Sequence, residues 1–436
     1  MFLTRRFYIV ISAVILLFVA GFWWQWSYRL ALCALGLMFL LFIIDVVMLY
    51  SKRGIDAHRQ CAERFSNGDD NKVEISVNST YKFPLSTSVI DEAPVVFQRR
   101  DIVFKLKLKS QDLKTIVYNL HPVRRGVYSF GQIRVFASTM IGMIQRRFTC
   151  GSHQDIKVYP SYLMLHNYEL LAISDRLTEQ GIKKIRRVGN NTEFEQIKVY
   201  VSGDDYRTIN WKATARRNKL MVNVYSEEKS QQVINVIDKG RVMQQAFNGM
   251  TLLDRAINAS LVLSYIAMHK EDKAGVMTFE KQFDSYIKPD RGTGHMQKIL
   301  EDLYHQGTTF GESDFSALCV NMQRFVTKRS LLVLYTNFFG QNALERQLPY
   351  LKQLSKRHVL LVVFFNDEEL EAYSQEPCRD MQDYYCHAVA EQVRMEKQNI
   401  IVTLRQCGIY SLLTSPEALT VDVINRYLEM KAKHVF

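Results

Sequence analysis

The sequence lacks the short motifs that mark the common catalytic sites. It has no Gly-x-x-x-x-Gly-Lys-Ser/Thr loop, no His-Glu-x-x-His pair and no Gly-x-Ser-x-Gly turn. Cys378, Cys386 and His387 fall in one charged stretch with helical character, but a cysteine nucleophile needs an orienting base that the sequence does not identify. We therefore expect a non-enzymatic protein without a cofactor, and keep an unrecognised hydrolase as an alternative.

Cysteine is scarce, and its pattern excludes a disulfide framework. The seven cysteines are odd in number and scattered, with no Cys-x-x-Cys, which is typical of reduced thiols and not of a zinc site. Acidic residues are fewer than basic ones, 44 against 56, which leaves a net charge of +12. This excess favours an anionic partner, either nucleic acid or a membrane surface.

Two apolar runs stand near the N-terminus, at residues 8–24 and 30–50. Each approaches the roughly 20 residues that a helix needs to cross a bilayer. A cluster of aromatic residues (Trp23, Trp24, Trp26 and Tyr28) lies around the short connection between them, as at a membrane interface. No small-x-small cleavage site follows the first run, and the second run comes at once, which argues against a signal peptide. We predict a transmembrane helical hairpin over residues 1–54.

Basic residues predict the orientation of this hairpin. Arg5 and Arg6 precede the first run, Lys52 and Arg53 follow the second, and the connection holds only Arg29. The positive-inside rule then places both ends of the hairpin, and the soluble domains, in the cytoplasm.

Asp45 lies inside the second apolar run. A carboxylate that faces lipid is costly and marks a functional acid. The alternative is a position near the inner end of the helix or against the partner helix, and we favour that alternative.

The β-rich part of the chain shows a period of two. Residues 55–72 are polar, and we interpret them as a spacer. Alternation of apolar and polar residues then follows over 73–77 and 102–109, with proline and glycine between the runs. We predict a small β-sandwich close to the immunoglobulin class, with its strands from residue 73 to 160, in a domain that spans 55–160. Arg125-Gly126 fits a hairpin corner in which glycine supplies a positive φ.

Strands alternate with helices from residue 231 onward. Apolar strands are predicted at 233–237, 274–279, 331–335, 359–365 and near 409–413, with helices at about 243–270, 294–306, 313–328 and 416–433. Continuous apolar strands between helices predict a doubly wound parallel sheet over residues 231–436. Ligands of such sheets bind beyond the carboxyl ends of the strands, where Asp238 and Thr336-Asn337 are placed.

Residues 161–230 form a connector, and residues 203–225 within it combine dense charge with one tryptophan. Arginine and tryptophan dominate binding hot spots, so this signature stretch is a candidate partner surface; a clamp between two domains and a solvated helix are the alternatives. The candidate residues are Gly203, Asp204, Asp205, Arg207, Trp211, Lys212 and Arg216. A helix within 161–190 and the basic run at 183–187 precede it, and we interpret the run as an exposed linker.

The signature stretch resembles that of the bacterial family called domain of unknown function 58, Gly-Asp-Asp-x-x-Arg-x-Ile-Asp-Trp-Lys-x-x-Ala-Arg. Residues 203–216 match this pattern, except that one residue, Tyr206, stands where the pattern has two before the Arg, and Asn210 stands where Asp is usual. Glu193-Phe194, Tyr200, the turn at 124–128 and the run 141–143 fit further family features. The resemblance implies a membrane protein of the bacterial inner membrane with a von Willebrand factor A-like domain. It also implies a MoxR-type AAA+ ATPase and other von Willebrand-domain membrane proteins as partners.

The resemblance raises the question of a metal site. Von Willebrand-type domains bind a divalent cation through Asp-x-Ser-x-Ser after the first strand, a later Thr and a later Asp. Here Asp238-Lys239-Gly240-Arg241-Val242 keeps the first Asp and loses both serines, and Asn337 replaces the later Asp. One carboxylate is a poor ligand set for magnesium, and hydroxyls from Thr308, Thr309 or Ser313 would not restore the charge. We predict a degenerate site without metal, in which Asp238 pairs with a neighbouring Lys or Arg or caps a helix.

These features lead to one functional expectation and one alternative. We expect a membrane-anchored scaffold that works with a MoxR-type ATPase in the assembly or maturation of protein complexes. The alternative is a basic membrane protein that binds nucleic acid or anionic lipid. Nucleic acid is the weaker option because the sequence shows no recognised nucleic-acid-binding fold.

Overall fold

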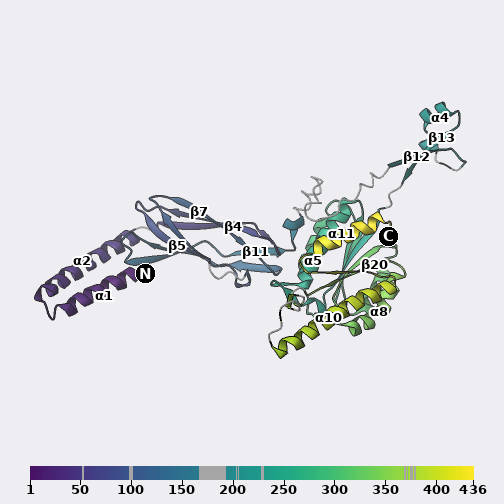
Figure 1. Cartoon of the computed structure of the whole chain (residues 1–436). Helices are drawn as coiled ribbons and strands as arrows, with labels where there is room; N and C mark the ends of the chain where they lie inside the picture. Colours follow the sequence, from purple (N-terminus) through teal and green to yellow (C-terminus); the bar gives the residue numbers. More distant parts are fainter. Residues whose placement is uncertain are drawn as a thin grey trace. The chain divides into compact units, whose positions relative to one another are not determined.

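The computed structural model describes residues 1–51, 54–97, 102–165, 193–202, 204, 206–226, 230–367, 370, 372–373, 377 and 380–436. The chain divides into two compact units, Met1–Leu163 and Met164–Phe436, each of which we describe by itself (Figure 1). The predicted helix within 161–190, the basic run at 183–187 and Cys378 lie largely or wholly outside the described residues.

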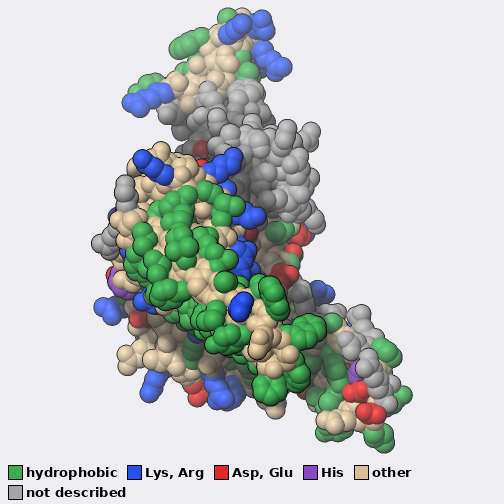
Figure 2. Space-filling view, turned by 90° about the vertical axis from the view of Figure 1, so that its left-hand side faces the viewer, with side chains coloured by type: hydrophobic (Ala, Val, Ile, Leu, Met, Phe, Trp, Pro, Cys, Tyr) green, Lys and Arg blue, Asp and Glu red, His purple; other side chains and the backbone are tan. Residues whose placement is uncertain are grey.

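Two helices open the first unit, α1 (Arg5–Ala20) and α2 (Gln25–Tyr50). They pack side by side and antiparallel, because the rings of Phe18 and Tyr28 lie 5.8 Å apart at one end and those of Phe7 and Phe42 lie 5.7 Å apart towards the other. Among the described residues, α2 is the helix long and apolar enough to cross a membrane. Hydrophobic side chains cover the surface of this region that faces the viewer in Figure 2.

Three sheets around one hydrophobic core form the rest of the first unit, which we call the β domain (residues 55–159, with Phe2–Leu3 as an edge strand). The strand orders are β1-β10-β9-β5-β6, β2-β4-β7 and β3-β11-β8. The strands are β1 (Phe2–Leu3), β2 (Ile55–Cys61), β3 (Arg64–Ser66), β4 (Asn71–Ser79), β5 (Leu85–Asp91), β6 (Val103–Leu108), β7 (Leu113–Leu120), β8 (Gly126–Phe130), β9 (Ile133–Ser138), β10 (Ile144–Cys150) and β11 (Gln154–Tyr159).

The predicted spacer at residues 55–72 is wrong, because β2 and β3 lie within it. Ile55 and Ala57 are buried, while Asp56 and His58 between them are exposed. The period of two is therefore present in β2, but its few inward side chains are small or isolated among polar residues. Pairing with β4 along the whole of β2 completes the strand.

A six-stranded sheet forms the centre of the second unit, in the order β18-β17-β14-β19-β20-β21. The strands are β14 (Gln232–Asp238), β17 (Lys273–Phe279), β18 (Phe283–Asp290), β19 (Leu331–Tyr335), β20 (Val359–Phe365) and β21 (Tyr410–Thr414), and all pairs except β17–β18 are parallel. The helices are α5 (Leu252–His269), α6 (His295–His305), α7 (Phe315–Phe325), α8 (Gln341–Ser355), α10 (Met381–Gln406) and α11 (Leu419–Ala432).

Both faces of this sheet are covered by helices, as the apolar strands predict. Val233 and Ile237 belong to a core shared with α5, α6 and α11, whereas Ile234 and Val236 belong to a second core shared with α7, α8 and α10. The predicted doubly wound arrangement is thus present. Alternate residues of β14 face opposite cores, so a strand buried on both sides is mostly apolar; the buried Asn235 is satisfied by hydrogen bonds to Ser260 and Ser264 of α5.

Two local predictions in this domain are wrong. The helix predicted from residue 243 begins at Leu252, because β15 (Ala246–Phe247) and β16 (Met250–Thr251) form a hairpin before it. Asn248 and Gly249 both have positive φ at this turn, 51° and 78°, as a two-residue Asn-Gly hairpin loop requires. The sequence prediction also omitted β18, the antiparallel edge strand.

Candidate partner surface and the carboxyl edge of the sheet

The signature stretch folds into a small module, which we call the signature module (residues 193–226). An antiparallel pair, β12 (Glu193–Val199) and β13 (Met221–Ser226), encloses a 3-10 turn η3 (Tyr206–Thr208) and a short helix α4 (Trp211–Arg217). Met221 and Val222 are buried at its centre. The described residues between the two strands thus form one local structure, in which Asn210 and Thr214 bond to β13 and most residues of α4 are exposed.

Asp204 has a local structural role in this module. Its carboxylate accepts hydrogen bonds from the Lys198 ammonium at 2.8 Å and from the Val201 N–H at 3.0 Å. These hydrogen bonds, first that from Lys198, lower the pKa of the Asp204 carboxyl below its usual value. The structure therefore assigns Asp204 to holding the loop, while Gly203 and Asp205 lie outside the described residues.

Asn210 begins α4. Its Oδ1 accepts a hydrogen bond from the Ala213 N–H at 3.0 Å, and its Nδ2 donates to Asn223 Oδ1 at 2.9 Å. An N-cap aspartate would supply the first bond and not the second, because a carboxylate has no N–H to donate. At the other end of the helix, Asn218 adopts a left-handed conformation with φ 55°, a common way for helices to end.

The remaining candidates in the signature module are exposed. The Trp211 side chain is 71% exposed and that of Tyr206 is 69% exposed. Arg207 is also exposed, and its guanidinium lies 5.8 Å from the centre of the Tyr206 ring. Four further basic residues of the module are exposed, and no ion pair is recorded for them among the described residues: Lys212, Arg216, Arg217 and Lys219. The module therefore presents two large aromatic rings beside basic groups.

Asp238 lies at the carboxyl end of β14, where it is fully buried. Its Oδ2 accepts a hydrogen bond from the Thr336 hydroxyl at 2.7 Å, and its Oδ1 accepts from the Gly240 N–H at 2.8 Å and from the Ser313 hydroxyl. Burial raises the pKa of the Asp238 carboxyl, and these three hydrogen bonds oppose the rise. The predicted pairing with a neighbouring Lys or Arg, or helix capping, is wrong: hydroxyls and one backbone N–H satisfy the carboxylate.

Lys239 points to a different set of partners. Its ammonium donates to the Asp284 carboxylate, to Gln306 Oε1 at 3.1 Å and to the Gly307 carbonyl at 2.9 Å. The side chain is almost fully buried. Asp284 neutralises this charge, and Gln306 and Gly307 accept further hydrogen bonds from it, so the adjacent Asp238 is left to its hydroxyl and backbone N–H donors.

The residues at this edge do not fit a divalent cation. Asn337 Oδ1 accepts from the Phe338 N–H at 3.1 Å, and Thr308 and Thr309 donate to the Lys239 carbonyl and to Glu280. A side chain at Gly240 would collide with Ser313, so the hydroxyl expected there has no room. Among the described residues, no group of three or more His, Cys, Asp and Glu side chains is placed to hold a metal ion.

Asp45 lies near the end of α2 and is fully buried. It accepts hydrogen bonds from the Thr139 hydroxyl and from the backbone N–H groups of Met143 and Ile144. The structure places Asp45 towards the C-terminal end of α2, and its hydrogen-bond partners belong to the β domain, not to the other helix.

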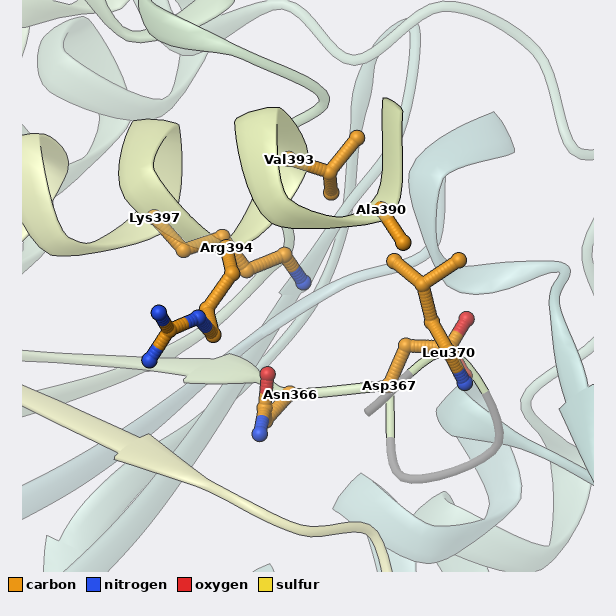
Figure 3. A pocket seen from close by; sticks show the side chains of 7 residues that line it. All are labelled: Asn366, Asp367, Leu370, Ala390, Val393, Arg394 and Lys397. Atoms are coloured by element: carbon orange, nitrogen blue, oxygen red, sulfur yellow. The ribbon is translucent and has the colours of Figure 1, made fainter. Parts of the chain in front are cut away.

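Lys397 is a buried cation that the sequence prediction missed. It lies in α10 and lines a cavity of about 290 Å³, including its open mouth, with Asn366, Asp367 and Arg394 among the other lining residues (Figure 3). Its ammonium donates to the carbonyl of Phe365, the last residue of β20. Burial lowers the pKa of Lys397, and the Asp367 carboxylate opposes this shift. The sequence did contain a sign of this burial, because Lys397 is spaced along α10 so that it shares the buried face with Ala390, Ile400 and Leu404.

The architecture defines a class: a multidomain chain in which an apolar N-terminal helix joins a β domain, followed by a doubly wound α/β domain. Residues 196–382 match the family described as "Protein of unknown function DUF58". The family resemblance predicted from the signature stretch is thus confirmed.

One relative and two solved structures illustrate what the chain is similar to. "Uncharacterized protein YeaD" of Bacillus subtilis (strain 168) is 25% identical over 279 residues, which cover 61% of this chain and 66% of that protein, or just under two thirds of its length. The solved structure of the protein BatB from Bacteroides thetaiotaomicron aligns over 47% of this chain and 100% of the BatB chain, with 13% sequence identity and a TM-score of 0.31. The CARDB domain of the PF1109 protein from Pyrococcus furiosus covers 24% of this chain and 93% of its own, with 11% identity and a TM-score of 0.19. Scores this low add nothing to the fold described above.

Proposed function

We propose that this chain is a non-enzymatic, membrane-anchored protein that binds other proteins through its signature module. The observation that carries this proposal is the exposure of Trp211, at 71%, in a module whose Arg207 and further basic residues are also exposed. A large aromatic side chain in water is unfavourable unless a partner covers it, and Trp and Arg contribute most to binding hot spots.

We propose a two-pass anchor with both ends of the helical pair on the cytoplasmic side. Thr4, just before α1, donates to the Gly142 carbonyl, and Asp45, near the end of α2, accepts from the next residue, Met143. One loop of the β domain thus holds both ends of the pair. Arg5 and Arg6 lie at this end of the helical pair and support its placement on the cytoplasmic side. The membrane that holds the pair would be the bacterial inner membrane.

We propose that residues 231–436 form a von Willebrand factor A-like domain with a degenerate metal edge. Support comes from the doubly wound sheet and from Asp238 at the end of its first strand. The partner implied by the family resemblance is a MoxR-type AAA+ ATPase, with other von Willebrand-domain membrane proteins in the same complex. The system would assemble or mature protein complexes at the membrane.

A second candidate function is binding of nucleic acid or anionic lipid. The basic side chains of the signature module favour it, because Lys212, Arg216, Arg217 and Lys219 are exposed without recorded ion pairs among the described residues. Binding of this kind weakens steeply with salt. Association with an ATPase that persists at high salt would favour the first function.

The test is a pull-down from detergent-solubilised membranes of the native host. Wild type is compared with the double variant Arg207→Ala, Trp211→Ala, and each is checked by thermal melting. The matched control replaces an exposed aromatic and an exposed basic residue of α10, Tyr385→Ala with Arg405→Ala; Tyr385 is 74% exposed.

We expect the ATPase with wild type and with the control, and its loss with the folded signature variant. A signature variant that melts far lower would instead assign the module to an interdomain clamp. If wild type recovers no ATPase, the proposed partner is wrong.

A further inference from the structure

The position of Asp45 along α2 sets the depth of the β domain in a membrane. At 1.5 Å per residue, Asp45 lies about 30 Å along the helix from Gln25, which is the thickness of the hydrocarbon core. Trp24 and Trp26, 76% and 80% exposed, surround the start of α2, where interfacial aromatics are expected. Asp45 therefore lies at the opposite boundary of the hydrocarbon core of the bilayer.

The loop 139–143 of the β domain is held at this depth. Thr139 and Met143 bond to Asp45, and Arg6 of α1 donates to the Met140 carbonyl at 3.0 Å. Gly142 has φ 66°, a left-handed conformation that favours glycine and fixes the shape of the loop. Two helices and one backbone turn thus position this loop at the boundary.

The side chains exposed at this level are apolar, with basic groups beside them. Met140, at the tip of the loop, is 77% exposed. Met1, Phe2 and Leu3 are 56%, 47% and 40% exposed, although Phe2 and Leu3 pair with β10. Arg5 and Arg6 follow after Thr4 and are exposed. We call residues 1–6 and 139–143 the basal patch.

We infer that the basal patch enters the interface of a phospholipid bilayer, with Met140 among the acyl chains and Arg5 and Arg6 at the phosphates. This inference rests on the proposed membrane anchor. Lipid is the occupant because the patch continues the apolar surface of α2 at the depth where that helix leaves the core. The β domain is then fixed against the membrane at two places, the helical pair and this loop.

The test is quenching of single tryptophans by brominated lipids in the full chain. Trp23, Trp24, Trp26 and Trp211 are first replaced by Phe, and the protein is reconstituted in phosphatidylethanolamine–phosphatidylglycerol vesicles. Three variants then receive one tryptophan each at exposed apolar positions: Met140→Trp tests the patch, Leu37→Trp reports insertion of α2, and Val127→Trp is the control. Leu37 and Val127 are 58% and 56% exposed.

Val127 is a matched control because it lies at the far end of the β domain. Val127 pairs with Lys157 of β11, and Lys157 pairs with Arg64, which follows the end of β2. Because β2 starts close to the end of α2, its length places Val127 about 20 Å farther from α2 than the start of β2. β11 lies on the side of the β domain away from α2 in Figure 1.

We expect lipids brominated near the glycerol to quench Met140→Trp, lipids brominated at mid-chain to quench Leu37→Trp, and neither lipid to quench Val127→Trp. Quenching at Leu37 without quenching at Met140 would overturn the inference and leave the anchor intact. Equal quenching at Met140 and Val127 would also overturn it. If Leu37→Trp is not quenched, the membrane anchor itself is wrong, and the inference falls with it.

Discussion

The carboxylate of Asp45 in α2 accepts a hydrogen bond of 2.9 Å from the backbone N–H of Met143, 98 residues farther along the chain. The N–H of Ile144 donates to the same oxygen at 3.0 Å, and the Thr139 hydroxyl donates to the other. Leu49, one turn later in α2, belongs to the hydrophobic core of the β domain. The last turns of α2 are thus part of the fold of the β domain, because polar and apolar contacts both join them.

Replacing Asp45 tests this joint. Asp45→Ala leaves two buried backbone N–H groups without partners, and each unsatisfied group costs roughly 1–3 kcal/mol. We expect the free energy of unfolding of the first unit to fall by about 2–5 kcal/mol, measured by denaturant titration in detergent. Asp45→Asn should be milder, because an amide oxygen still accepts from both N–H groups.

The control for this comparison is Asp56→Ala, which removes an exposed carboxylate from β2. It should leave the free energy of unfolding within about 0.5 kcal/mol of wild type. A loss with Asp45→Ala no larger than with Asp45→Asn or with the control would show that Asp45 does not hold the joint.

Asn210 offers a second test, confined to the signature module. Asn210→Ala removes the N-cap of α4, which costs about 1 kcal/mol. We expect faster amide hydrogen exchange over residues 211–217. Asn210→Asp keeps the cap and loses the hydrogen bond to Asn223, so exchange there should lie between wild type and the alanine variant. Equal exchange in all three proteins would show that the cap does not stabilise α4.

The fold was predictable wherever burial sets the pattern of the sequence. Residues 331–335 and 359–365 are apolar throughout because β19 and β20 are buried on both faces. β2 was missed because polar residues outnumber its few inward side chains. The β15–β16 hairpin was missed because its strands are two residues long, although Asn248-Gly249 marks its turn. Short strands carry too few residues for a period to show.

The candidate sites were less predictable, because their partners come from distant parts of the chain. The signature stretch could be located from its residues, and α4 could be expected after Asn210. The partners of Asp238 could not, since Ser313 and Thr336 are brought to it by the crossover connections of the sheet. Sequence gives the residue types at a sheet edge, whereas the choice of hydrogen-bond partner depends on loop geometry.

The burial of Lys397 makes the free energy of unfolding depend on pH in the alkaline range. Burial lowers its pKa below the usual 10.5, so between the folded and unfolded pKa values the unfolded chain binds a proton that the native chain does not. Stability from this group therefore rises as pH increases through that window. Lys397→Met removes the titration. We expect the free energy of unfolding of wild type, minus that of the variant, to increase as pH approaches 10.5, measured by urea titration.

The matched control for Lys397 is Lys356→Met, at the exposed end of α8. The change of its difference from wild type over the same pH range is the reference for Lys397→Met. A difference for Lys397→Met that changes no more than this reference would contradict the burial of a titrating ammonium at Lys397.

The burial of Asp238 makes stability depend on pH with the opposite sign to that of Lys397. Burial raises its pKa above the usual 3.8, so in the window above 3.8 the native chain holds a proton that the unfolded chain has released. Stability from this group is complete below the unfolded pKa and is lost as pH rises through the folded pKa. Asp238→Asn has nearly the same shape, and its amide still accepts from the Gly240 N–H and donates to Thr336. We therefore expect the stability of wild type, relative to this variant, to decline as pH rises above 3.8.

The measurement is urea unfolding of both proteins at several pH values, with Glu312→Gln as the control. Glu312 is an exposed carboxyl in the same loop as Ser313, and Glu312→Gln shows how the measurement responds to the loss of an exposed carboxyl. If the Asp238→Asn difference changes with pH no more than the Glu312→Gln difference, or if wild type gains on Asp238→Asn as pH rises, then hydrogen bonds from Ser313, Thr336 and Gly240 outweigh the burial of the charge. Asp238 would in that case be held as a stable carboxylate.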